Sequence, residues 1–107
     1  MRIFLDGCPD WRLSRDIIGH DVKTARQMGL TIIGNGELLA LAAAQFDVFV
    51  SVDRNMSFQQ NLLSHRIAIV VLHAKTNRLA DLRPLVPRML ATLGLAKPGA
   101  VTRIGAD

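Results

Sequence analysis

The fold is decided by residues 67–72, whose sequence is Ile67-Ala68-Ile69-Val70-Val71-Leu72. A strand that is apolar at every position is buried on both faces, which is typical of the interior of a parallel sheet covered by helices. Two further runs, 3–5 and 48–52, have the length and composition of buried strands. Weaker strands are expected at 20–24 and 101–104, so the sequence supplies enough strands for one small sheet.

Helical patterns alternate with these strands, and we expect them over 10–18, over 25–28, after the loop 30–36, from 55 or 57 to 65, and from 77 to 93. Asn35 and either Thr76 or Asn77 are the expected helix caps, and Pro87 implies a kink or break in the last helix. Alternating strands and helices indicate βαβ units. We therefore predict an α/β fold of three layers, with a central, mainly parallel sheet of four to five strands flanked by helices.

Length and composition limit the classes of protein. The chain has 107 residues, which favours one domain over 1–107, with the last ten residues forming a tail or an edge strand. One cysteine excludes an internal disulfide and favours a reducing compartment, so we expect a cytoplasmic protein. No apolar run is long enough to cross a bilayer, and no membrane partner is expected.

The net charge of +4 is the balance of thirteen basic and nine acidic residues, and ten of the basic residues are arginines. Arginine binds phosphate through two parallel hydrogen bonds, so a polyanionic partner such as RNA fits this composition. The charge alone leaves the partner open, because the sequence contains no basic tail and few aromatic residues for stacking on bases.

Three acidic residues are the candidate catalytic and metal-binding groups. Asp6 and Asp53 each end an apolar strand pattern, and Glu37 opens the helix between them. Ligands of parallel sheets bind outside the carboxyl ends of the strands, and clustered carboxylates suit Mg²⁺ or Mn²⁺. The alternative is structural: both aspartates would cap strand ends, and Glu37 would be a solvated acid of a first helical turn.

Polar residues follow two of the predicted strands and are the candidate substrate-binding groups. Arg54 and Asn55 come after the strand 48–52, and Lys75, Asn77 and Arg78 come after the strand 67–72. Amide and guanidinium groups at these positions would contact a phosphate backbone. The alternative is an ordinary loop with a capped helix in each case.

Other residues that carry chemistry elsewhere are interpreted as structural. Cys8 has no histidine partner at a suitable spacing and is expected to be a small buried residue. Trp11 is expected in the core or at an interface, not as a platform for bases. The histidines lack the spacing of metal ligands; they are His20, His65 and His73.

In order and spacing, several short motifs together resemble the short bacterial PIN-like proteins of unassigned function, relatives of the PIN-domain toxin nucleases. The resemblance covers residues 1 to about 95. The motifs that carry it are Met1-Arg2-Ile3-Phe4-Leu5-Asp6, Gly19-His20-Asp21-Val22, Met28-Gly29, Asn35-Gly36-Glu37-Leu38-Leu39-Ala40-Leu41-Ala42, Phe46-Asp47-Val48-Phe49, Val52-Asp53-Arg54-Asn55, Gln59-Gln60-Asn61-Leu62 and Asn77-Arg78-Leu79.

The resemblance implies a PIN-like fold, RNA hydrolysis, and a site for Mg²⁺ or Mn²⁺ formed by Asp6, Glu37 and Asp53. It also implies a homodimer and a partner antitoxin. This chain departs from the family in one place: Gly7 stands where these proteins commonly have an acid after the first strand, and Asp10 is a substitute one helical turn away.

Three functions follow as hypotheses. The first is a Mg²⁺- or Mn²⁺-dependent endoribonuclease that forms the toxin of a toxin–antitoxin pair. The second is a catalytically degenerate PIN-like module that acts through protein–protein interaction, which Gly7 favours. The third is a receiver-like signalling domain, against which the absence of a lysine at the end of a terminal strand argues.

Overall fold

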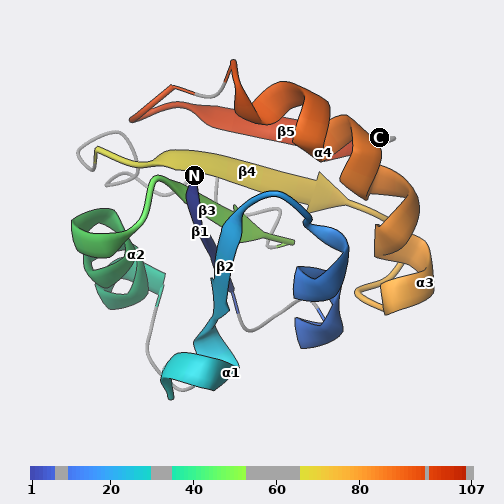
Figure 1. Cartoon of the computed structure of the whole chain (residues 1–107), viewed down its shortest axis with the longest axis horizontal. Coiled ribbons are helices and arrows are strands. Elements are labelled where there is room, and N and C mark those ends of the chain that lie inside the picture. Colours follow the sequence, from blue (N-terminus) through green and yellow to red (C-terminus); the bar gives the residue numbers. More distant parts are fainter. Residues whose placement is uncertain (7–9, 30–34, 53–65, 96, 106–107) are drawn as a thin grey trace.

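Five parallel strands form a sheet in the order β2-β1-β3-β4-β5 (Figure 1). The computed structural model describes residues 1–6, 10–29, 35–52, 66–95 and 97–105, with the backbone alone over 35–39. The strands are β1 Arg2–Leu5, β2 Asp21–Thr24, β3 Val48–Ser51, β4 Ala68–His73 and β5 Val101–Gly105. The predicted α/β class with a central parallel sheet is therefore confirmed, and every described strand pair is parallel.

Helices lie on both faces of this sheet (Figure 1). The described helices are the 3₁₀ helices η1 Trp11–Asp16 and η4 Arg83–Leu85 and the α-helices α1 Ala25–Met28, α2 Asn35–Gln45, α3 Leu79–Leu82 and α4 Val86–Leu93. The side chains of η1, α3 and α4 pack on one face, and those of α1 and α2 pack on the other.

The helix predicted through residue 93 is interrupted, as Pro87 indicates: helical residues run from 79 to 93, but as α3, η4 and α4 in succession. Pro84 lies in the first turn of η4 and Pro87 in the first turn of α4. Proline lacks an amide hydrogen, so it starts a helix easily but interrupts one that is already running. The predicted caps are wrong, since Arg78 is the N-cap of α3 and Asn35 is already helical. The helix predicted up to residue 65 lies outside the described residues.

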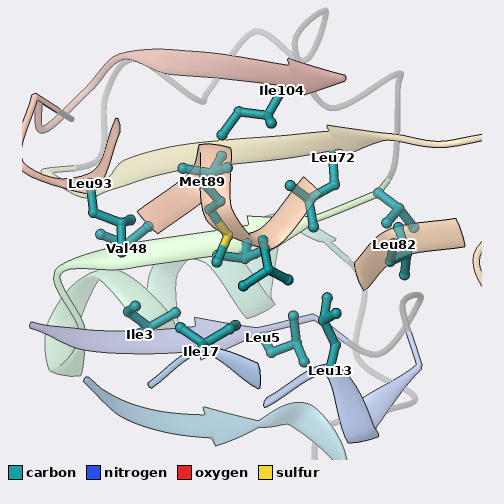
Figure 2. Packing of buried hydrophobic residues seen from close by; sticks show 14 of the residues in the cluster. Ile3, Leu5, Leu13, Ile17, Val48, Leu72, Leu82, Met89, Leu93 and Ile104 are labelled. Carbon is teal, nitrogen blue, oxygen red and sulfur yellow. The ribbon is translucent and has the colours of Figure 1, made fainter. Parts of the chain in front are cut away.

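Alternation along the strands divides the core into two clusters. Figure 2 shows the larger cluster, in which Ile3, Leu5 and Val48 of the sheet meet Leu13 of η1 and Met89 of α4. The intervening strand residues point to the other face. There Phe4 packs against Phe49 and Phe46, with ring centroids 5.5 and 5.3 Å apart. A fully buried aromatic side chain contributes roughly 1.5 to 3 kcal/mol, so these apolar runs supply much of the stability.

The order of the strands determines where a ligand would bind. In the sheet, β2 lies beside one edge of β1, and β3 lies beside the other edge of β1. Doubly wound sheets with this order bind ligands at the switch point between β1 and β3, outside the carboxyl ends of the strands. Residue 6 follows β1 directly, and residue 53 follows β3 closely. The topology therefore directs attention to the end of the sheet that carries Asp6.

Candidate functional site

Asp6 lies at the switch point and is held by β3. The register pairs Leu5 with Val50, and the Asp6 amide donates to the Val50 carbonyl at 2.9 Å. The Ser51 hydroxyl, at the end of β3, donates to Asp6 Oδ2 at 2.8 Å. Alternation places both side chains on the sheet face that carries Phe4. The predicted strand-end carboxylate is thus real, and it has a specific partner from the neighbouring strand.

Burial makes this hydrogen bond energetically important. Asp6 is only 5% exposed and Ser51 is fully buried. A buried carboxylate is costly unless hydrogen bonds stabilise it, and a hydrogen bond to a charged group contributes about 1.5 to 3 kcal/mol. Ser51 is the one polar residue in the apolar run 48–52, and that was the signal in the sequence that could have identified it.

The side chains of the other two predicted acids lie outside the described part of the structure. Glu37 lies in the first turn of α2, where the backbone alone is described, and Asp53 lies outside the described residues. Within the part of the chain that the structure describes, no three residues among His, Cys, Asp and Glu are grouped to hold a metal ion. Asp6 supplies one hard oxygen ligand of the kind that Mg²⁺ and Mn²⁺ prefer. The three-carboxylate site stays a prediction.

The predicted phosphate-binding residues after β4 lie on an exposed turn. Lys75, Asn77 and Arg78 are all exposed. The turn is held by Thr76, whose hydroxyl accepts from the Arg78 amide at 3.1 Å and donates to the Asp81 carboxylate. Thr76 therefore orders the turn before α3 instead of capping the helix. Arg54 and Asn55, the predicted counterparts after β3, lie outside the described residues.

His73 ends β4 at the same edge of the sheet. Its Nε2 atom is buried and has no hydrogen-bond partner among the described residues. Its carbonyl faces Gly105 of β5 so closely that a side-chain carbon at position 105 would lie 2.1 Å from the oxygen. Nothing in the spacing of the histidines indicated this placement.

Trp11, expected in the core or at an interface, is partly exposed, and two arginine side chains lie over its ring. The guanidinium carbons of Arg15 and Arg26 lie over its indole ring at 5.0 and 5.1 Å from the centroid. Each contact contributes about 0.5 to 1 kcal/mol at an exposed site. One indole therefore holds two positive charges together, a group that we call the Arg–Trp–Arg stack.

No pattern in the sequence indicates this stack. Arg15 and Trp11 belong to η1, whereas Arg26 belongs to α1, which follows β2 along the chain. The start of α1 is fixed at the end of β2 by a capping box: the Thr24 side chain accepts from the Gln27 amide, and the Gln27 side chain accepts from the Thr24 amide. Only the folding of both helices at the same end of the sheet brings Arg26 to the indole.

Asp10, the proposed substitute for the missing acid at position 7, is engaged elsewhere. Its carboxylate accepts from the Arg12 backbone amide at 3.0 Å and from Arg12 Nε and Nη2 at 3.0 and 2.6 Å. These bonds cap η1 and lower the pKa of Asp10 from 3.8 to about 2. Asp10 is thus a helix-capping acid in an ion pair.

This ion pair gives a testable titration. We expect the Asp10 carboxyl carbon to titrate with a pKa of about 2 in wild type and with a higher pKa in Arg12→Gln, because the side-chain bond to Arg12 is the largest cause of the shift, whereas the bond from the backbone amide of residue 12 is retained. A lowered folded pKa means that the pair stabilises the protein above the unfolded pKa and loses this effect as the pH falls towards 2. Carbon-detected NMR measures both values, and equal pKa values in the two proteins would show that Arg12 does not hold the carboxylate.

The described surface hollows are at the opposite end of the sheet. One has a volume of about 360 Å³ and is lined by Arg2, Asp21, Lys23, Met28, Ala44, Gln45 and Phe46. A second, of about 240 Å³, includes Met1, Asp47 and Arg66. Both lie beside the amino ends of strands, where ligands of parallel sheets do not usually bind.

Comparison with known proteins adds no relative. No protein-family model, curated protein or solved structure matches this chain. Among the described helices, none has the length and apolar composition needed to cross a bilayer. The functional argument therefore depends on the site and on the sequence.

Proposed function

We propose that this protein hydrolyses RNA phosphodiesters with the help of Mg²⁺ or Mn²⁺. The observation that supports the proposal is Asp6: a buried carboxylate at the switch point of a parallel sheet, oriented by a hydroxyl from the next strand. Carboxylates are seldom buried unless they are paired, as Asp6 is with Ser51, and ligand sites of such sheets lie at this position. The predicted partners Glu37 and Asp53 belong to the same proposal.

Each residue has a defined part in this chemistry. When bound, the metal lowers the pKa of a water and neutralises charge on the phosphodiester. Asp6 and Asp53 would hold the ion, and Glu37 would hold it as well or orient the attacking water. Ser51 keeps the Asp6 carboxylate in one orientation through its hydrogen bond. Arg54, Asn55, Lys75, Asn77 and Arg78 would contact phosphate.

The wider biological setting is part of the same proposal. A toxin of this kind acts on cellular RNA, so we place it in the cytoplasm. It would work as a homodimer and be silenced by an antitoxin protein. These features come from the resemblance to the PIN-like proteins.

A catalytically degenerate module is the second candidate function. Gly7 favours it, because the acid common at that position in the resembling proteins is absent. The ion pair between Asp10 and Arg12 adds support, since it occupies the acid that could have replaced the missing one. Such a module would keep the fold and act by binding another protein.

Thermal melting in Mn²⁺ tests the proposal. At tenfold above the dissociation constant, a site that binds only the folded protein adds about 1.4 kcal/mol, which raises the melting temperature by roughly 5 to 10 °C. We expect this rise for wild type and its loss in Asp53→Asn, followed by Mn²⁺-dependent cleavage of RNA by wild type alone.

Two results would reject the nuclease. One is the lack of any rise in wild type at Mn²⁺ concentrations well above millimolar. The other is an equal rise in both proteins, which would place the metal away from the carboxylates. Metal binding without RNA cleavage would favour the degenerate module, and the Gly7→Glu variant would then be tested for a gain of cleavage.

A further inference from the structure

We propose that the Arg–Trp–Arg stack is a binding site for the phosphodiester backbone of single-stranded RNA. The proposal deepens the proposed function, on which it rests, by assigning substrate binding to Trp11, Arg15 and Arg26. None of the three was among the residues expected from the sequence to bind phosphate.

The first argument is that these two arginines have no carboxylate partner among the described residues. Among the described residues the ion pairs are Arg12 with Asp10 and Arg83 with Asp16, at 2.6 and 2.9 Å. Arg15 and Arg26 are exposed and take part in neither. Two positive charges on one ring, with no described acid paired to either, favour an anion that contacts both.

The second argument is geometry. Both guanidinium carbons lie about 5 Å from one ring centroid, so they are no further apart than the sum of those two distances. A guanidinium that stacks on an aromatic face keeps the N–H donors along its edge, and that edge forms parallel hydrogen bonds with phosphate. The indole thus orders two flexible side chains in advance, which lowers the entropic cost of binding.

The third argument is position. Trp11 begins η1, which follows the carboxyl end of β1, and Arg26 lies in α1, which follows the carboxyl end of β2 without a gap. Asp6 lies at this same end of the sheet, immediately after β1. A strand of RNA held by the stack would therefore run along the edge where the carboxylate site is predicted. A single strand suits two closely spaced guanidinium groups, whose contacts carry no sequence information.

Fluorescence anisotropy with a short, labelled uridine oligoribonucleotide tests the site. The measurement uses the full chain in EDTA, so binding is observed without metal or cleavage, and it is repeated over a series of salt concentrations. For Arg15→Gln/Arg26→Gln we expect the dissociation constant to rise by at least about tenfold. The slope of log affinity against log salt should become shallower by about 1.4, since each lost phosphate contact changes it by about 0.7.

Matched variants separate the stack from simple charge. Arg12→Gln/Arg83→Gln removes an equal charge of two, but Arg12 is already paired with Asp10 and Arg83 with Asp16, so its affinity should stay within about twofold of wild type. Arg15→Lys/Arg26→Lys should keep the salt slope and still bind more weakly, because lysine has no planar fork. Trp11→Phe should preserve binding, whereas Trp11→Leu should weaken it. Melting curves establish that each variant is folded.

Several outcomes would overturn the inference. Unchanged affinity in Arg15→Gln/Arg26→Gln would show that RNA binds elsewhere. Wild-type affinity in Arg15→Lys/Arg26→Lys would show that positive charge, and not the guanidinium geometry, accounts for the binding. If a polyglutamate peptide of equal charge bound as tightly, with the same dependence on both arginines, the ligand would be an acidic protein segment. Failure of the nuclease is a separate result: binding of RNA through the stack by wild type, without any cleavage in Mn²⁺, would reject catalysis only.

Discussion

Replacing Gly105 with alanine is expected to lower the free energy of unfolding by about 3 to 5 kcal/mol. The backbone of Gly105 has φ near +123°, a region that residues with a side chain rarely adopt. The new carbon would also lie 2.1 Å from the His73 carbonyl oxygen and 2.9 Å from its carbon. The neighbouring atoms are backbone of β4, which cannot move aside without breaking the ladder between β4 and β5.

Urea denaturation of Gly105→Ala beside Gly94→Ala measures this effect. Gly94 has φ of −66° and no atom within 4 Å of an added carbon, so its alanine variant should be unchanged or more stable by up to about 1 kcal/mol. A loss below about 1 kcal/mol in Gly105→Ala would contradict the expectation. It would mean that the last residue of β5 separates from His73 at little cost.

Replacing Asp6 with asparagine is expected to lower Mn²⁺-dependent RNA cleavage by about a thousandfold, equivalent to about 4 kcal/mol in the barrier, because it removes a carboxylate that would hold the metal. The fold should survive, because the asparagine carbonyl can still accept the hydrogen bond from Ser51 that Asp6 Oδ2 accepts at 2.8 Å. Single-turnover cleavage of a labelled RNA, with thermal melting in EDTA, measures both effects.

Asp16→Asn is the matched control for this prediction. It makes the same chemical change in an acid of η1 that pairs with Arg83 at 2.9 Å, and it should leave cleavage unchanged. Equal cleavage by wild type and Asp6→Asn would contradict the metal-binding role of Asp6. The buried pair with Ser51 would then be a structural connection between β1 and β3.

The proposed site has a part that the sequence indicates and a part that it does not. Asp6 was predictable, because an acid that directly ends an apolar strand stands out against its neighbours. The Arg–Trp–Arg stack was not, because Arg26 is distant from Trp11 along the chain and has no pattern of its own. The stack would bind the RNA backbone and the carboxylate would act on it, so the two parts describe one substrate path.

The strands and the interruption of the last helix illustrate how much local pattern determines. The apolar runs around Val50 and Val70 became interior strands, since no other arrangement buries both of their faces. Pro87 indicated that the last helix could not be continuous. The exact caps were missed, because Arg78, Thr76 and Asp81 arrange their hydrogen bonds only once the turn after β4 has formed.

By itself, the sequence determined the α/β class, the parallel sheet, the strand positions and one acid at a strand end, because hydrophobic period and helix-breaking residues act within a few positions. Tertiary structure alone decided the strand order, the hydrogen bond from Ser51 to Asp6, and the meeting of Arg15 and Arg26 on Trp11. The physical reason is that these features join residues from different elements, and the packing of the two sheet faces determines which elements become neighbours.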